Sequence, residues 1–183
     1  MIRSLALTLC VVLGFLWVPE GSASVGEGLT LDELVARADE IVMARAIAAE
    51  SRFEDGRIVT EVELERVETI RGHGGERLRL ITPGGTVGEI GMRVEGAPQI
   101  PVGTEAVLFG RRTERGVRAV GMAQGVFPVR TREGRPWVHP NGAGIALVRR
   151  DAQGRLSRVS PSLEAPMELE AFLSEVRERA ARR

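Results

Sequence analysis

The sequence predicts a mainly β fold, a small antiparallel barrel with a short helix near its N-terminus and a second helix at its C-terminus. First, Arg57–Ile70 alternates apolar and polar residues with a period of 2, which is typical of a strand with one buried face. Second, this alternation slips between Leu64 and Val67, and such a slip indicates a β-bulge that curls a sheet toward closure. Third, short apolar runs separated by glycine turns follow up to Val159.

Residues 1–24 are expected to form a secretory signal peptide. Arg3 precedes an apolar run, Leu5–Val18, and Pro19 and several small residues follow, so we expect cleavage after Ala23 or Ser24. The alternative, a membrane anchor, needs a run of about 20 residues, and this run is shorter. We therefore expect a protein exported to the periplasm or outside the cell, with no membrane segment after cleavage.

Residues 25–183 are then expected to form one domain, which includes a terminal helix over 166–183. The single cysteine, Cys10, lies in the predicted signal peptide, so the mature domain has neither a disulfide nor a thiol nucleophile. A domain of this length is expected to be stabilised by its core alone.

The composition indicates which partners to expect. Basic and acidic residues balance at 25 each, which argues against a nucleic-acid partner. All the basic residues are arginine; this suggests either recognition of phosphate or carboxylate groups or a GC-rich genome. The sequence has no tyrosine and only 4% aromatic residues, so no stacking platform for bases or sugars is expected.

The first elements after residue 24 are a short helix and a strand. Leu29–Ala38 is expected to be helical, with Thr30 as N-cap and Glu33 completing a capping box. Asp39–Phe53 fits either a continued helix, because it is rich in alanine, or a buried strand over Ile41–Ala48. We favour the strand, because Asp55-Gly56 between two apolar runs signals a hairpin.

Further short strands follow the hairpin. Arg77–Thr82 alternates and is expected to be the third strand; Pro83-Gly84-Gly85 is expected to turn, and Thr86–Glu95 to form an irregular, bulged strand. Ala97–Thr104 is expected to be a loop. Glu105–Gly110 has an unbroken apolar centre and should be buried on both faces. The remaining expected strands are Val117–Val120, Val126–Thr131, Pro136–His139, Ile145–Arg150 and Leu156–Val159.

Glutamates at positions 61, 63 and 65 fall on the polar face of the curled strand, where like charges would destabilise it. Arg77 and Arg79 on the next strand are positioned to oppose them. We therefore predict a Glu–Arg ladder across these two strands.

The C-terminal segment Pro166–Arg183 is expected to be a helix with Pro166 in its first turn. Its apolar stripe, Leu169, Phe172, Leu173 and Val176, would dock on the barrel.

No catalytic motif is present. The sequence contains no GxSxG, no phosphate-binding GxxxxGK[ST] and no HExxH, so no catalytic residue and no cofactor are predicted. His73 and His139 lack the neighbours that a zinc site requires, so no metal site is predicted either.

The segment Thr82–Gln99 is the best candidate for a binding surface, because five glycines and two prolines shape an irregular loop there. The candidate binding residues are Thr82, Gly84, Gly85, Arg93, Glu95, Gln99 and Gln124. The alternative is that the glycines form barrel corners, that Gln124 is a buried residue satisfying backbone groups, and that Trp137 is an apolar lid on the barrel.

Five segments together carry a resemblance to known families: LTLDELVARADEIVMARAIAAES, DGRIVTEVELERVETIRG, LITPGG, GMRVEGAP and AVLF. The chain resembles, over about Leu29–Val129, a group of exported bacterial domains of unknown function. It is also loosely similar to the OB-type barrel of netrin-like and metalloprotease-inhibitor domains. The similarity to the netrin-like domains implies an OB-like, partly open barrel. Because the inhibitors depend on cysteines that the mature chain lacks, no functional residue transfers.

Taken together, these observations predict an exported, non-catalytic domain that binds a protein partner in the cell envelope or outside the cell, through Thr82–Gln99. The alternative is a hydrolase or metal-dependent enzyme whose site forms only in three dimensions, with a histidine beside two carboxylates.

Overall fold

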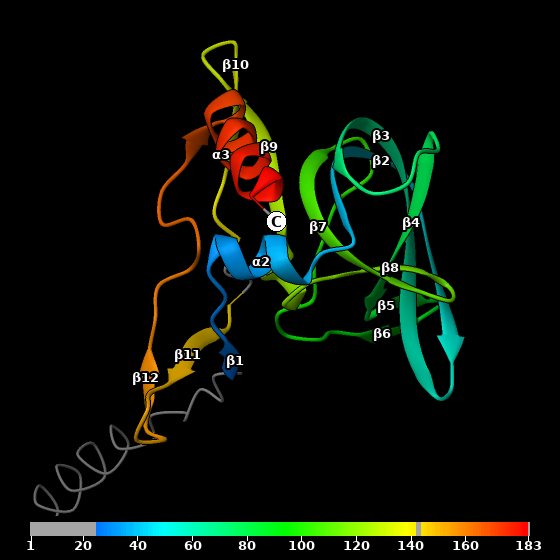
Figure 1. The fold of residues 1–183 in the computed structure, drawn as a ribbon. Coiled ribbons are helices and arrows are strands. Elements are labelled where there is room, and N and C mark those ends of the chain that lie inside the picture. Colours follow the sequence, from blue (N-terminus) through cyan, green and yellow to red (C-terminus); the bar gives the residue numbers. More distant parts are fainter. Residues whose placement is uncertain (1–24, 142–143, 183) are drawn as a thin grey trace, which may run out of the picture.

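The computed structural model describes residues 25–141 and 144–182, and the predicted signal peptide lies outside them. A barrel occupies one side of the molecule, and two helices lie on the other side against the strands that extend from it (Figure 1). The helices are α2 (Leu31–Arg37) and α3 (Leu169–Ala181), with a 3₁₀ turn η1 (Met122–Gly125). The strands are β1 (Val25–Glu27), β2 (Glu40–Glu54), β3 (Arg57–Arg71), β4 (Arg77–Pro83), β5 (Gly85–Val87), β6 (Ile90–Met92), β7 (Glu105–Thr113), β8 (Gly116–Ala119), β9 (Val126–Arg132), β10 (Arg135–Val138), β11 (Ala146–Arg150), β12 (Leu156–Arg158) and β13 (Met167–Glu168).

Five strands close the barrel in the order β7-β2-β3-β4-β8, and β8 pairs back to β7. The pairing is antiparallel except between β4 and β8, which meet in parallel at Leu80 and Val117. This single bridge makes the closure partial. Strands β9, β10 and β13 continue the sheet from β7 beyond the ring. The predicted mainly β, partly open, OB-like barrel with two helices is therefore confirmed.

Strands β2 and β3 form the long hairpin on which the barrel is built. Its turn is Asp55-Gly56, with φ values of 49° and 76°, as the sequence predicted. Strand β2 is longer than the expected Ile41–Ala48, because it pairs with β3 as far as Glu54.

Three register shifts bend the β2–β3 hairpin, and one of them skips Val67, where the sequence phase slips. The apolar pattern of the sequence resumes at Val67, yet this residue is bulged out and 51% exposed. The side chain of Arg66 is the buried one, only 9% exposed, because it has a buried carboxylate to pair with.

The first part of β2, residues 40–44, and the centre of β7, residues 106–110, are buried on both faces. Val42, Ala44 and Leu108 point into the barrel core, while Ile41 and Phe109 belong to a second core beneath the helices. This explains the unbroken apolar runs of both strands, and it confirms the strand interpretation of residues 41–48.

Helix α2 carries the predicted capping box. The Glu33 backbone amide donates to the Thr30 hydroxyl (3.2 Å), and the Thr30 amide donates to the Glu33 carboxylate (2.8 Å). The apolar residue Leu34 is fully buried in the second core.

Helix α3 begins at Leu169 rather than near Pro166, because Met167 and Glu168 first pair with β10 as the short strand β13. The predicted apolar stripe of α3 is buried. Its Phe172 ring lies 6.5 Å from Phe109 of β7 and 5.0 Å from Phe127 of β9, so three phenylalanines fasten the helix to the sheet.

The predicted Glu–Arg ladder is present on the outer face of the barrel. Arg77 donates to Glu63 (2.7 Å) and Arg79 to Glu61 (3.5 Å). Arg52 of β2 also donates to Glu61 (3.0 Å), so the ladder spans three strands.

Two predicted features differ from the structure. The expected irregular strand Thr86–Glu95 is a small separate hairpin, β5–β6. Trp137 is not a lid on the barrel, because β10 pairs with β9 and β13 outside the closed ring.

The short strands β1, β11 and β12 form a third, separate sheet. Within the described residues, no helix has the length and apolar character needed to span a membrane.

A buried carboxylate lies where the ends of β2, β3 and β7 meet. Glu40 is 1% exposed; it accepts hydrogen bonds from Arg112 Nε (2.7 Å) and from Arg66 (3.0 Å). Burial alone would raise the pKa of the Glu40 carboxyl, but the hydrogen bonds from Arg112 and Arg66 outweigh it and hold the pKa below its usual value. Gly72 lies against this carboxylate with a φ of 127°, where a Cβ would overlap it.

Glu40→Gln is expected to lower the free energy of unfolding by about 3 kcal/mol at pH 7, because it leaves the buried Arg66 without an anionic partner. Since the pKa of Glu40 is lowered in the folded state, its contribution is complete above the ordinary glutamate pKa of about 4.3 and is lost as the pH falls below that value. Urea unfolding of both proteins between pH 3 and pH 7 measures this.

The matched control is Glu63→Gln, which removes an exposed member of the ladder and should change the stability by less than about 1 kcal/mol. Equal losses in the two variants, or a gap that does not narrow in acid, would contradict the assignment.

Candidate functional site

A groove opens at one end of the barrel, and we call it the mouth groove. It has a volume of about 550 Å³. Its lining residues are Ala49, Thr60, Val62, Thr82, Pro83, Gly84, Gly85, Thr86, Gly91, Met92, Arg93, Val94, Ala97, Pro98, Gln99, Ile100 and Pro101. Of the predicted binding residues, Thr82, Gly84, Gly85, Arg93 and Gln99 therefore lie together in one hollow.

Hydrogen bonds hold the β5–β6 hairpin against the barrel on one side of the mouth groove. The Gly84 amide donates to the Ile58 carbonyl (2.8 Å), and the Thr60 hydroxyl donates to the Gly84 carbonyl (2.6 Å). The Ser51 hydroxyl lies 2.8 Å from that of Thr60 and accepts from the Thr86 amide at 3.4 Å. These polar contacts fix β5 over strands β2 and β3.

Gly85 is required at this junction. Its φ is 134°, and a Cβ there would overlap the Ser51 and Thr60 hydroxyl oxygens. Only a residue without a side chain lets β5 approach the barrel this closely. The glycine-rich composition of this segment therefore has a local structural cause.

The other side of the mouth groove is the loop 93–101. The Thr82 hydroxyl, which is buried, donates to the Pro98 carbonyl (3.0 Å) and fixes the loop to β4. Ile100 then inserts into the barrel core beside Val62 and Leu80. The floor of the groove is thus apolar and well packed.

Polar groups remain available at the rim of the mouth groove. Gln99 is exposed, and its side-chain amide has no hydrogen-bond partner among the described residues. The Arg93 side chain is 83% exposed and pairs with Glu95 at 2.8 Å. Glu95 itself does not line the groove. The rim can therefore offer an amide and a guanidinium group to a bound molecule.

Gln124 lies apart from the mouth groove and has a structural role. Its Oε1 accepts from the Leu29 amide (2.9 Å), while its Nε2 donates to the carbonyls of Glu27 (2.9 Å) and Gly121 (3.2 Å). The interpretation of Gln124 as a buried residue satisfying backbone groups is confirmed. These bonds attach the segment before α2 to η1.

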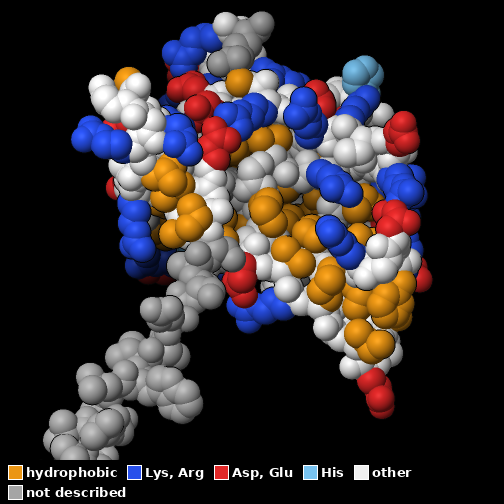
Figure 2. Space-filling view, turned by 90° about the horizontal axis from the view of Figure 1, so that it is seen from below, with side chains coloured by type: hydrophobic (Ala, Val, Ile, Leu, Met, Phe, Trp, Pro, Cys, Tyr) orange, Lys and Arg blue, Asp and Glu red, His pale blue; other side chains and the backbone are white. Residues whose placement is uncertain are grey.

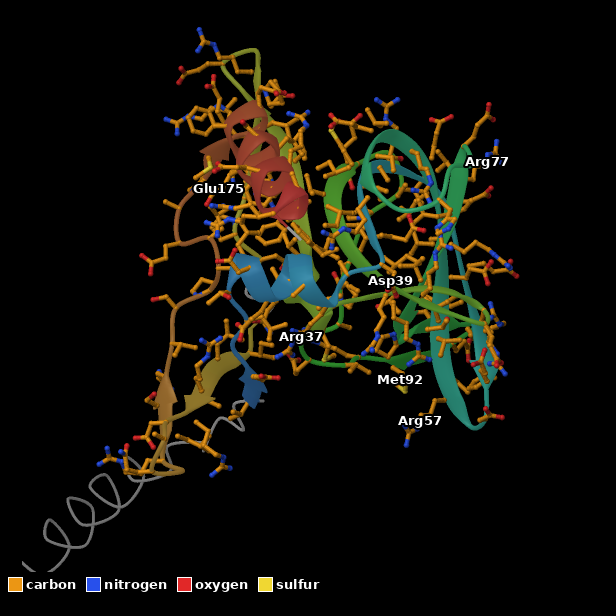
Figure 3. The ribbon with its side chains drawn as sticks, viewed as in Figure 1. Arg37, Asp39, Arg57, Arg77, Met92 and Glu175 are labelled. Carbon is orange, nitrogen blue, oxygen red and sulfur yellow. The ribbon has the colours of Figure 1, made fainter. Side chains whose placement is uncertain are left out.

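A second hollow of about 780 Å³, the outer groove, adjoins the first. It is lined by Glu54, Asp55, Arg57, Ile58, Val59, Pro83, Met92, Val94 and Arg118. Pro83, Met92 and Val94 line both grooves and form a ridge between them. Arg57 and Met92 lie at the same end of the barrel, and Arg77 lies near the other end (Figure 3). Seen from below, this face shows a gathering of hydrophobic side chains interrupted by basic ones (Figure 2).

The enzyme alternative requires a histidine beside two carboxylates, and no such group is assembled in the part of the chain that the structure describes. No group of three or more histidine, cysteine, aspartate or glutamate side chains there could hold a metal ion. Neither His73 nor His139 lines the mouth groove or the outer groove. Burial, together with the charges of Arg130 and Arg132, lowers the pKa of His139 and favours the neutral imidazole.

Comparison of the chain with protein-family models and with curated proteins finds no match in either. The resemblance to exported bacterial domains therefore stays a prediction.

Sequence reasoning missed the part of this site that lies outside Thr82–Gln99. Ser51 and Thr60 hold the hairpin, and Arg57 and Arg118 line the outer groove. The hydroxyl of Thr60 falls on a strand face that was otherwise expected to be apolar, and that departure was the available signal; Ser51 lies beyond the expected strand Ile41–Ala48. Nothing in the sequence pattern indicated that Arg118 would lie near Arg57.

Gly85→Ala is expected to loosen the β5–β6 hairpin and to lower the free energy of unfolding by about 1–3 kcal/mol, because alanine is strained at this φ and collides with the two hydroxyls. Amide hydrogen exchange of residues 84–92 should become faster. In the control, Gly91→Ala on the same hairpin, the new Cβ meets only an ordinary contact with Thr86. Similar exchange in the two variants would argue against this attachment of the hairpin.

Proposed function

We propose that this protein is an exported, non-catalytic domain that binds a protein partner through the mouth groove. Export is inferred from the signal-peptide pattern of residues 1–24, namely Arg3, the apolar run Leu5–Val18 and the small residues before Val25. A protein partner is inferred from the character of the groove.

The observation that carries the proposal is an open, apolar hollow on a rigid support. Its floor consists of core residues such as Val62 and Ile100, so it keeps its shape without a ligand. A preformed surface lowers the ordering cost of association, which favours binding.

The lining of the mouth groove also indicates the class of molecule bound. It contains three threonines, one glutamine and one arginine, but no aromatic ring and no carboxylate. Bases and sugars are usually recognised by stacking on rings, so this lining suits them poorly. An apolar floor with a few polar groups at the rim is typical of protein-binding surfaces.

A photo-crosslinking residue at position 99 tests the proposal in the cells that produce the protein. Because Gln99 is exposed at the groove rim, we expect this probe to capture one or a few discrete proteins. In the control, the photo-crosslinking residue replaces the exposed Arg158, on the separate sheet of β12, and should not capture these proteins.

The intact mass of the tagged protein tests export. It should correspond to cleavage after Ala23 or Ser24.

Identical capture from positions 99 and 158, or no capture from either, would contradict the binding proposal. An intact mass that retains Met1 would contradict the export proposal separately.

A further inference from the structure

Most arginines of the described residues donate to a carboxylate or to a backbone carbonyl. The guanidinium groups that have no ion pair or hydrogen bond among the described residues are those of Arg57, Arg111, Arg118, Arg130 and Arg158. Three of these five lie together at the end of the barrel that carries the grooves. Arg57 and Arg118 line the outer groove, and Arg111 pairs with Arg118 across the β7–β8 ladder.

Unpaired positive charge at this position is unfavourable for the isolated domain. Like charges directly opposite on neighbouring strands destabilise a sheet. The Glu–Arg ladder neutralises such charges elsewhere on the barrel, but it does not include Arg57, Arg111 or Arg118. Of the two carboxylates in the outer groove, Glu54 is already paired with Arg52 and Arg115, and only Asp55 remains. The local surplus is positive.

The surroundings of these arginines are apolar. Ile58, Val59, Pro83, Met92 and Val94 form the rest of the outer groove. Next to it, Phe53 pairs in register with Ile58 and is 53% exposed. A partner that fits this surface therefore needs both carboxylates and apolar side chains.

The edge of β6 suits an extended partner. Strand β6 has a single ladder partner, β5, in the part of the chain that the structure describes. Gly84, just before β5, is bonded to Ile58, and Thr86 of β5 is bonded to Ser51, so β6 is the outer strand of this small sheet. An open edge can add a strand from another chain through main-chain hydrogen bonds.

We infer that the partner presents an acidic, extended segment of a protein, in which carboxylates and apolar side chains are interspersed. Apolar side chains enter the mouth groove and pack on the ridge of Pro83, Met92 and Val94, and carboxylates pair with Arg57 and Arg118. This inference rests on the proposed function and adds the chemistry of the partner. Arg111, opposite Arg118, increases the local positive potential.

Selection of a displayed random-peptide library on the purified full-length chain tests the inference. We expect the enriched peptides to combine Asp or Glu with aliphatic residues. Arg57→Gln with Arg118→Gln should weaken binding of the best peptide about tenfold, since the variant loses two exposed ion pairs. Added salt should weaken binding of that peptide to the wild-type protein.

Arg130→Gln with Arg158→Gln is the matched control, because these arginines are equally unpaired but lie on β9 and β12. It should bind the best peptide as the wild-type protein does. Thr86→Trp, an exposed position on β5 that lines the mouth groove, should abolish binding by filling the groove.

The outcomes separate the two proposals. Enriched peptides without acidic residues, lost in Thr86→Trp but not in the Arg57/Arg118 double variant, would overturn the inference and leave the proposed function standing. Absence of any enriched peptide would overturn both. A single-stranded oligonucleotide serves as a further probe. If it binds more tightly than the best peptide, and if the Arg57/Arg118 double variant weakens its binding as well, the groove is assigned to nucleic acid and the inference is overturned.

Discussion

Burial of residues 40–44 of β2 and 106–110 of β7 on both faces is the constraint on which the rest of the structure depends. One face of each strand fills the barrel, and the other receives the helices, so two cores share one pair of strands. This arrangement requires β3 to curve around β2, and the bulges that skip Val67 and Ile70 allow that curvature. The described residues contain no cysteine, so burial of apolar side chains stabilises them without a covalent cross-link.

The same constraint explains where charge enters the interior. At the start of β2 the hairpin meets β7 beside β8, and the carboxylate of Glu40 fills the junction instead of an apolar side chain. A buried carboxylate is tolerated only with compensating donors, and Arg66 and Arg112 supply them from two other strands. The two ion pairs of Glu40 with Arg66 and Arg112 therefore fix the relative register of β2, β3 and β7.

The helices cover one side of the shared strands and leave the other end of the barrel without a helix. A small hairpin and a proline-rich loop fill that place, and polar contacts of Thr60, Thr82 and Ser51 hold them there. Because these segments contribute little to the core, apart from Ile100, hollows remain between them and the barrel. The grooves that we assign to partner binding arise in this way.

The sequence predicted most of the barrel, because period-2 alternation, the Asp55-Gly56 turn and the capping box of Thr30 and Glu33 are local signals. It also predicted the segment that lines the mouth groove. It did not indicate the inward Arg66, and it placed Pro166 wrongly in the first turn of the helix. Each depends on a distant partner: Glu40 for Arg66, and β10 for the strand before α3. The approach of Arg118 to Arg57 depends on barrel closure, which no local pattern encodes.

Native-state hydrogen exchange tests the central claim most directly. If the shared burial of β2 and β7 stabilises the domain, their central amides, at residues 41–44 and 106–109, should exchange slowest and only through global unfolding. The amides of β5 and β6 should exchange earlier, through local opening. Fast exchange in the centre of β2 or β7, or equal protection of β6, would contradict the account.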